Sequence, residues 1–180
     1  MVSIGAAIPD FELDAYQNNI IRKIKLSDYR SKWLIVLFYP ADFTFVCPTE
    51  LFEAAQHYDE IKKLGAEIVS VSCDTAFVHK AWHDNFPAIG TVQYPMLADP
   101  TGDVCRAFGT YIEDEGLSLR GTFIIDPDGI LRSMHIHDNN IGRSINEIIR
   151  MLEAGIYVRE HKGEACPASW KPGDEAVKVK

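Results

Sequence analysis

The chain has 180 residues, enough for one domain with a sizeable core, and its 47% hydrophobic and 24% charged residues are typical of a soluble globular protein. A formal net charge of −8 argues against a nucleic-acid partner, because phosphate binding needs clustered lysine and arginine. No run approaches the roughly 20 apolar residues of a membrane span, so we expect no membrane partner. The N-terminus lacks the basic region and apolar core of a signal peptide, which favours a cytoplasmic location.

The first predicted element is a β-hairpin. Apolar and polar residues alternate over residues 11–16, and apolar residues return over 20–26 with basic residues between them. Asn18 and Asn19 lie between the two runs, and asparagine tolerates the positive φ of a tight turn. This hairpin precedes the main body of the fold.

Residues 34–65 contain the strand and the helix around which the rest of the chain is organised. The uninterrupted apolar run at 34–39 predicts a strand buried on both faces, as in a parallel sheet. Pro40 ends it, because proline cannot donate to a sheet ladder. After a loop, apolar residues recur at helical spacing, and the predicted helix ends at Gly65.

Cys47 lies where this helix begins. Pro48 fits the first helical position, so Cys47 is predicted at the N-cap, where unpaired N–H groups and the helix dipole favour a thiolate. The alternative is a small buried hydrophobe, but the strand, the proline, the loop and the helix start together favour a reactive cysteine. Position 50 holds Glu50, so Cys47 has no C-x-x-C partner, and any resolving thiol lies elsewhere.

The order of the remaining elements predicts an α/β fold of the thioredoxin-like class, with the hairpin as an N-terminal extension. We expect one domain over residues 1–160 and a mobile C-terminal tail over 161–180, which is rich in glycine, proline and charge. The predicted elements are a strand at 67–72, a helix capped by Asp74 or Thr75 and running to about Phe86, a short edge strand at 94–99, a short helix at 103–108, strands at 122–125 and 130–136 around an Asp126–Gly129 turn, and a helix from a Ser144/Glu147 capping box to Gly155.

Thiolate formation alone gains only about 30-fold in reactivity, roughly 2 kcal/mol, so a catalytic cysteine also needs groups that stabilise the charge that develops in the transition state. Thr44 offers a hydroxyl three residues before Cys47. An arginine would complete such a site, because its charge is fixed and its fork can bridge sulfur and oxygen. The sequence alone does not choose among the arginines.

Three other cysteines compete as the resolving thiol. Cys73 ends an apolar strand and Cys105 lies in a short helix, so both are expected to be packed and inert. Cys166 lies in Gly-Glu-Ala-Cys-Pro, where exposure and mobility would suit thiol–disulfide exchange, and it is our choice. The histidine pairs have no third ligand at suggestive spacing, so we expect no metal site at His79 and His83 or at His135 and His137.

Residues 38–50, with Pro40, Thr44 and Cys47 spaced P-x-x-x-T-x-x-C, resemble the peroxidatic motif of peroxiredoxins. The similarity is greatest to the typical two-cysteine group, which includes the peroxidase subunit of alkyl hydroperoxide reductase. Three further segments agree, so the resemblance covers nearly the whole chain: residues 116–129, 141–144 and 163–173.

The resemblance implies a thiol-specific peroxidase that reduces hydrogen peroxide and organic hydroperoxides without haem, flavin or metal. It implies that Arg120 and Thr44 activate Cys47 and bind peroxide, and that Arg143 pairs with Glu50 in support. Cys47 would become a sulfenic acid and then form an intersubunit disulfide with Cys166. A thioredoxin-like or flavoprotein disulfide reductase would restore the thiols.

The family further implies a homodimer, assembled as a decamer of five dimers. The competing interpretation from another class is a non-enzymatic holdase chaperone or redox-signalling scaffold on the same fold. Peroxide consumption with a reductant separates the two, because a scaffold would show none. A disulfide oxidoreductase is disfavoured by Glu50 in place of a second cysteine.

Overall fold

The computed structural model describes residues 1–179. The chain divides into two compact units, the first Met1–Arg143 and the second beginning at Ser144. The boundary lies before the last helix, whereas the sequence pattern places it after that helix, at residue 160. No helix among the described residues is long and apolar enough to span a membrane.

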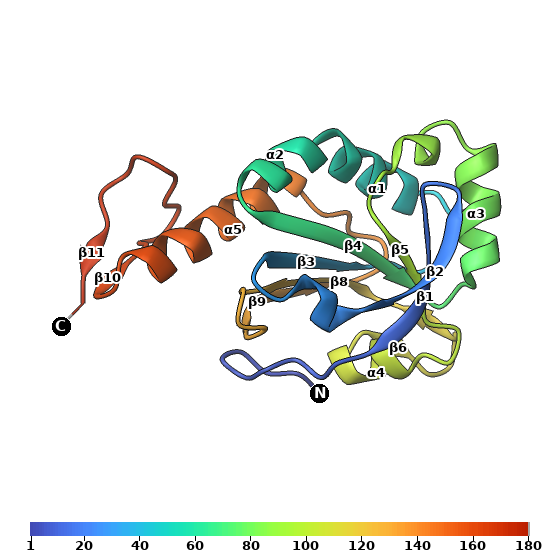
Figure 1. Cartoon of the computed structure of the whole chain (residues 1–180), viewed down its shortest axis with the longest axis horizontal. Coiled ribbons are helices and arrows are strands. Elements are labelled where there is room, and N and C mark those ends of the chain that lie inside the picture. Colours follow the sequence, from blue (N-terminus) through green and yellow to red (C-terminus); the bar gives the residue numbers. More distant parts are fainter. Residues whose placement is uncertain (180) are drawn as a thin grey trace. The chain divides into compact units, whose positions relative to one another are not determined.

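A seven-stranded mixed sheet forms the first unit, in the order β2-β1-β5-β4-β3-β8-β9 (Figure 1). The pairs β3·β4 and β4·β5 are parallel, and the other pairs are antiparallel. The α/β class predicted from the sequence is confirmed. The strands are β1 (Glu12–Gln17), β2 (Ile20–Lys25), β3 (Trp33–Phe38), β4 (Ala66–Ser72), β5 (Met96–Ala98), β8 (Arg120–Ile125) and β9 (Leu131–His137), with a separate two-stranded sheet of β6 (Tyr111–Ile112) and β7 (Leu117–Ser118).

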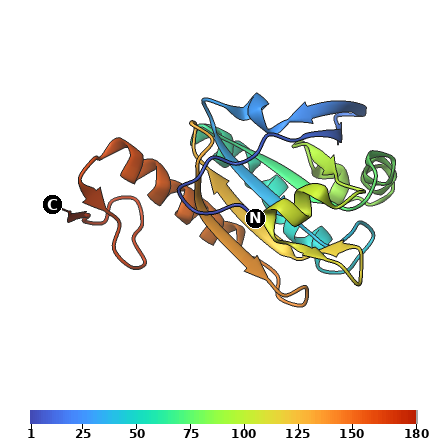
Figure 2. The same cartoon turned by 90° about the horizontal axis from the view of Figure 1, so that it is seen from below.

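Helices cover both faces of this sheet. Figure 1 shows α1 and α2 over one face, and Figure 2 shows α4 in front of the other. Every residue of β3 is buried, as its apolar run predicts, and alternate side chains serve the two faces. The face toward α4 carries Val36 and Phe38, which pack in one cluster with Phe108. The helices are α1 (Cys47–Gln56), α2 (Tyr58–Lys63), α3 (Ala76–Asn85) and α4 (Asp103–Phe108), with 3-10 turns at Leu26–Tyr29 and Ile89–Thr91.

Both predicted hairpins are confirmed. Asn18 and Asn19 connect β1 to β2 with φ of 50° and 64°, the left-handed conformation for which asparagine was expected. Between β8 and β9, the Asp126 carboxylate accepts hydrogen bonds from the N–H groups of Asp128 and Ile130. This carboxylate fixes the turn that returns the chain to the sheet.

Two sequence expectations for this unit are wrong in detail. The helix predicted to end at Gly65 is interrupted at His57, which separates α1 from α2. The helical spacing of apolar residues continues across the break, so the pattern does not reveal it. The segment predicted as an edge strand, β5, lies inside the sheet between β1 and β4, because Pro95 precedes the strand and the N-terminal hairpin pairs with its free edge.

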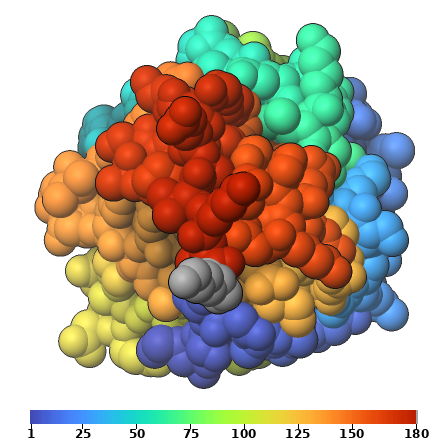
Figure 3. All heavy atoms as spheres, turned by 90° about the vertical axis from the view of Figure 1, so that its left-hand side faces the viewer, coloured from blue at the N-terminus to red at the C-terminus, as the bar shows by residue number. Residues whose placement is uncertain are grey.

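The second unit consists of α5 (Ile145–Glu160) and a folded C-terminal segment, shown in orange and red in Figure 3. Ser144 caps α5 as predicted, accepting from the Glu147 N–H. The predicted end at Gly155 is wrong by five residues. The Tyr157 ring holds the last turn, because it lies 4.8 Å from the Trp170 ring, centroid to centroid.

The expected mobile tail is instead a folded segment. Strands β10 (Glu164–Ala165) and β11 (Val177–Lys178) pair antiparallel, and Trp170 is only 3% exposed. A buried tryptophan supplies a small apolar core that the glycine, proline and charge content of this stretch conceals.

Candidate active site

Cys47 is the first residue of α1 and is fully buried. It does not occupy the expected N-cap, which is Val46, so Pro48 takes the second helical position. Proline is tolerated there for the same reason, since the first N–H groups of a helix have no partner within it. No side-chain oxygen caps this helix start.

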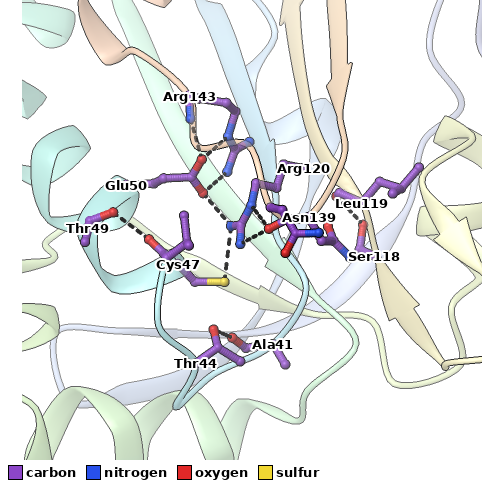
Figure 4. A network of polar contacts seen from close by, with 12 residues as sticks. Ala41, Thr44, Cys47, Thr49, Glu50, Ser118, Leu119, Arg120, Asn139 and Arg143 are labelled. Carbon is purple, nitrogen blue, oxygen red and sulfur yellow. Dashed lines mark hydrogen bonds and ion pairs between the residues drawn. The ribbon is translucent and has the colours of Figure 1, made fainter.

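Arg120 meets the sulfur from the sheet. It begins β8 and is 3% exposed, and its Nη1 donates to Cys47 Sγ at 3.3 Å (Figure 4). Nε and Nη2 both donate to the Asn139 carbonyl oxygen, at 3.0 and 2.9 Å. Gly121 follows directly, and a Cβ added there would lie 2.6 Å from the Thr110 side chain, so only glycine allows β8 this close approach.

Glu50 joins two arginines. Its Oε2 accepts from Arg120 Nη1 at 2.8 Å and from Arg143 Nη2 at 2.9 Å. Its Oε1 accepts from Arg143 Nε at 2.9 Å and from the Arg143 backbone N–H at 2.8 Å. Arg143 therefore grips the carboxylate bidentately, and Arg120 bridges that carboxylate and the Cys47 sulfur. The predicted pairing of Glu50 with Arg143 is present in the structure.

The three charged side chains are almost inaccessible to water, with Glu50 2%, Arg120 3% and Arg143 7% exposed. Burial by itself raises the pKa of the Glu50 carboxyl. The hydrogen bonds from Arg143, together with the charges on Arg143 and Arg120, outweigh burial and hold that pKa below its ordinary value. The carboxylate thus remains charged and fixes both guanidinium groups.

Thr44 lies on the opposite side of the Cys47 sulfur from the arginine (Figure 4). Its hydroxyl donates to the Ala41 carbonyl oxygen at 2.8 Å, which leaves the hydroxyl oxygen free to accept a hydrogen bond. Pro40 is buried just after β3, and it ends the strand as predicted. Arg120 and Thr44 therefore lie on either side of one sulfur, and Glu50 and Arg143 hold Arg120 in place.

Sequence reasoning missed the groups that hold the loop before Cys47. The Asp42 backbone N–H donates to Asp74 Oδ2 at 2.8 Å, and the Asp42 carboxylate lies 2.7 Å from His79 Nδ1 and accepts from the Tyr39 hydroxyl. His79 Nε2 also contacts the Leu97 carbonyl oxygen at 3.1 Å, so both ring nitrogens have partners. The helical position of His79 gave no sign of this long-range pairing. The Asn139 carbonyl was missed too, because any residue could supply it.

The resolving candidate, Cys166, lies in the second unit. It is half-buried, and its thiol donates to the Ala154 carbonyl oxygen at 3.8 Å, so it is less exposed than expected. Burial raises the pKa of the Cys166 thiol, and the charge on Arg150 offsets part of this effect. Cys166 in this form is a protected thiol.

Comparison with known proteins agrees with this geometry. The model of the AhpC/TSA family matches residues 4–134, and the model for the C-terminal domain of 1-Cys peroxiredoxin matches residues 157–179. The chain belongs to the AhpC/TSA family of peroxiredoxins. The expectations of a peroxiredoxin and of a thioredoxin-like fold are confirmed.

Relatives in this family resemble nearly the whole chain. Alkyl hydroperoxide reductase C of Amphibacillus xylanus is 48% identical over 99% of this chain and 95% of its own length. The Escherichia coli K12 protein of the same name is 44% identical over 98% and 95%. The crystal structure of Enterococcus faecalis AhpC has a TM-score of 0.90 and 45% identity, and covers 93% of this chain and 100% of that one. A reduced 2-Cys peroxiredoxin from Plasmodium vivax has a TM-score of 0.92 at 30% identity, over 96% of this chain and 91% of that one.

This peroxiredoxin is therefore an enzyme, a thiol-dependent peroxidase that reduces hydroperoxides. The competing interpretation as a non-enzymatic holdase or scaffold is not favoured.

Proposed function

We propose that Cys47 is the peroxidatic nucleophile and that Arg120 and Thr44 bind and polarise the peroxide. The observation that carries the proposal is the 3.3 Å contact between Arg120 Nη1 and Cys47 Sγ, with both residues buried. A guanidinium in this position stabilises negative charge on the sulfur and, as the O–O bond breaks, on the departing oxygen.

The hydrogen-bond directions at the sulfur match a hydroperoxide. Arg120 offers only hydrogen-bond donors. The Thr44 hydroxyl donates its hydrogen bond to the Ala41 carbonyl oxygen, so its own oxygen can accept one. A peroxide has one O–H donor and oxygen acceptors, so its O–H donates to Thr44 while its oxygens accept from Arg120. As a thiolate, the Cys47 sulfur attacks the outer oxygen and keeps it as a hydroxyl, the O–O bond breaks, and the leaving oxygen takes a proton from solvent and departs as alcohol or water. Cys47 becomes a sulfenic acid.

Resolution by Cys166 of a second subunit requires α1 to open at its first turn. Cys47 is fully buried, and a disulfide needs Cα atoms roughly 4.4–6.8 Å apart, so the folded site excludes a thiol from another chain. The uncapped start of α1 makes this turn the easiest to lose. Hydrogen exchange over residues 43–52 should be faster in the disulfide form than in the reduced form. Equal or slower exchange would contradict local unfolding.

Exposed aromatic rings support assembly beyond the monomer, and we place a dimer–dimer contact at the loop before Cys47 and at α3. Phe43 is 56% and Phe77 75% exposed, and the loop meets α3 where the Phe43 ring lies 6.0 Å from that of Trp82. Large exposed aromatic groups typify association surfaces. Homodimers would join here into a decamer of five dimers. Phe77→Arg should then sediment as dimers, whereas Lys80→Arg on the same helix should keep the wild-type mass.

Peroxide turnover tests the assigned cysteines. With a thioredoxin-like or flavoprotein disulfide reductase, Cys47→Ser should lose the fast turnover of the wild type, because Arg120 contacts no other sulfur. Cys166→Ser should rapidly consume about one equivalent of peroxide per subunit and then lose this fast phase, because the Cys47 sulfenic acid has no resolving thiol. Oxidised wild type should run as a dimer on a non-reducing denaturing gel. Turnover by the Cys47 variant at the wild-type rate, or a monomeric oxidised wild type, would refute the assignment.

A further inference from the structure

A second pair of sulfur atoms lies in the first unit. Cys73 directly follows β4 and Cys105 lies in α4, and their Sγ atoms are 3.8 Å apart although 32 positions separate them in the sequence. Neither residue contributes to the Cys47 site described above. The sequence led us to expect two unrelated, packed thiols, and their proximity is visible only in the fold.

Asp99 holds the two cysteines together. Its backbone N–H donates to the Ser72 carbonyl oxygen at 2.9 Å, immediately before Cys73, and its Oδ2 accepts from the Cys105 N–H at 2.7 Å. Asp99 is thereby hydrogen-bonded both to Ser72, the residue before Cys73, and to Cys105 itself. Cys105 is fully buried in the core cluster, so the two thiols cannot separate unless α4 moves.

The two thiols are chemically unequal. Cys73 is half-buried, whereas Cys105 has no exposed surface. The contact with Cys105 lowers the pKa of the Cys73 thiol, which burial opposes. The same contact, with burial and the charge of Asp99, raises the pKa of Cys105. The lowered pKa and partial exposure of Cys73 favour it as the attacking thiol, with Cys105 held beside it as the partner.

We propose that Cys73 and Cys105 form a second redox-active dithiol, which a hydroperoxide oxidises to an intrachain disulfide. The Cys73 thiol loses its proton to solvent, and the thiolate attacks the outer peroxide oxygen, which stays on the sulfur as the hydroxyl of a sulfenic acid. The O–O bond breaks, and the leaving oxygen takes a proton from solvent and departs as alcohol or water. The Cys105 sulfur then attacks Cys73 Sγ, the S–S bond forms, and the hydroxyl leaves as water with the Cys105 proton. Overall, two thiols lose two hydrogen atoms and the hydroperoxide is reduced.

Forming the bond needs little movement. The sulfurs close from 3.8 Å to the roughly 2.05 Å of a disulfide, within the reach of side-chain rotation. Oxidation should be slower than at Cys47, because the cation nearest this pair in sequence, Arg106, donates instead to Glu113 at 2.8 Å. The inference does not depend on the roles proposed for Cys47 and Cys166.

The test uses the full chain with Cys47→Ser and Cys166→Ser, so that of its four cysteines only this pair remains. Treatment with excess hydrogen peroxide should reduce the thiols counted after denaturation from two to none. The intact mass should fall by about 2 Da, and a reducing agent should reverse the change. The protein should remain a monomer on a non-reducing denaturing gel, and peptide mapping should link Cys73 to Cys105.

Two triple variants are the matched controls, one also carrying Cys73→Ser and the other Cys105→Ser. Each has a single thiol and should show no mass decrease. Two intact thiols after peroxide, or a gain of about 16 or 32 Da on Cys73 with Cys105 still reduced, would overturn the proposal. If the double variant does not fold, mapping of peroxide-treated wild type decides the question, because the linked Cys73–Cys105 peptide is either present or absent.

Discussion

Cys47 and Cys73 belong to the same folded unit, yet their sulfurs face different groups. Cys47 faces a guanidinium, with Arg120 Nη1 at 3.3 Å, and Cys73 faces another thiol at 3.8 Å. A fixed positive charge assists attack on peroxide, whereas a neighbouring thiol assists the step after it, when the sulfenic acid is captured. The comparison teaches that the neighbour of a sulfur decides which half of the redox reaction is fast.

The two sulfurs also differ in what must move. Cys47 is fully buried and contacts an arginine instead of a second thiol, so the disulfide proposed for it requires the start of α1 to open. Cys73 already has its partner, held by the hydrogen bonds of Asp99, and needs only side-chain rotation. The Cys47 site favours fast reaction with peroxide, and the Cys73–Cys105 pair favours disulfide formation within one chain.

Among the changes that would separate the Cys47 site from the Cys73–Cys105 pair, Glu50→Gln should have the largest effect. This change leaves Arg120 and Arg143 buried without their common carboxylate, and breaking a buried ion pair typically costs about 3–5 kcal/mol. Urea unfolding should show a loss of this size, and Glu53→Gln in the same helix is the matched control. Peroxide oxidation of Cys73 and Cys105 should be unchanged. A loss below about 0.5 kcal/mol would show that Glu50 does not hold the arginines.

Acid should remove the same stabilisation in the wild type. The pKa of Glu50 is lowered in the folded protein from its ordinary value of 4.5, so its ionised form stabilises the fold above pH 4.5. That contribution is lost as the pH falls through the lower, folded-state value. The gap in unfolding free energy between wild type and Glu50→Gln should therefore narrow below pH 4.5. A constant gap would contradict this linkage.

Arg120→Ala should slow oxidation of Cys47 by roughly 100- to 1,000-fold, because it removes a preorganised donor from the transition state. Stopped-flow measurement of the first turnover gives the rate, and Arg22→Ala, an exposed change on the N-terminal hairpin, is the control. Oxidation of the Cys73–Cys105 pair should keep its rate, which separates the two sulfurs directly. If oxidation of the Arg120 variant at pH 9 reaches the wild-type rate, the transition-state role is wrong.

Cys166 extends the comparison to a third environment, with the smallest expected effect. Burial raises the pKa of its thiol above the ordinary 9.0, and the thiolate is the attacking species. Disulfide formation after a single turnover should therefore accelerate about tenfold per pH unit between pH 7 and 9. Rapid quench with alkylation and a non-reducing gel measures this rate. A rate independent of pH over that interval would show that the pKa of the Cys166 thiol is not raised in the assembled protein.

Local signals predicted much of the first unit. Strand β3, the asparagine turn and the position of Cys47 to within one residue follow from sequence spacing, because each depends on near neighbours. Sequence spacing could not predict the long-range contacts. The Asp42–His79 pair and the approach of Cys73 to Cys105 join residues 37 and 32 positions apart, so they appear only once the sheet is assembled.

For the C-terminal unit, the sequence prediction missed local structure that is present. Its composition suggested disorder, but one buried tryptophan and a short strand pair organise it. The contribution of Trp170 depends on the Tyr157 ring packed against it, and neither residue alone indicates the contact. Average composition therefore underestimates a segment whose stability depends on a single aromatic cluster.

The ion pairs of Glu50 with Arg120 and Arg143 also set the balance of charge around Cys47. With Cys47 as a thiolate, the buried group contains two negative charges, on the sulfur and Glu50, and two positive charges, on Arg120 and Arg143. Conversion of the thiolate to a neutral sulfenic acid leaves one positive charge unmatched in a medium of low dielectric constant. On the mechanism proposed for Cys47, peroxide reduction would thereby weaken the attraction between the start of α1 and β8. The proposed chemical step would itself favour release of the oxidised sulfur.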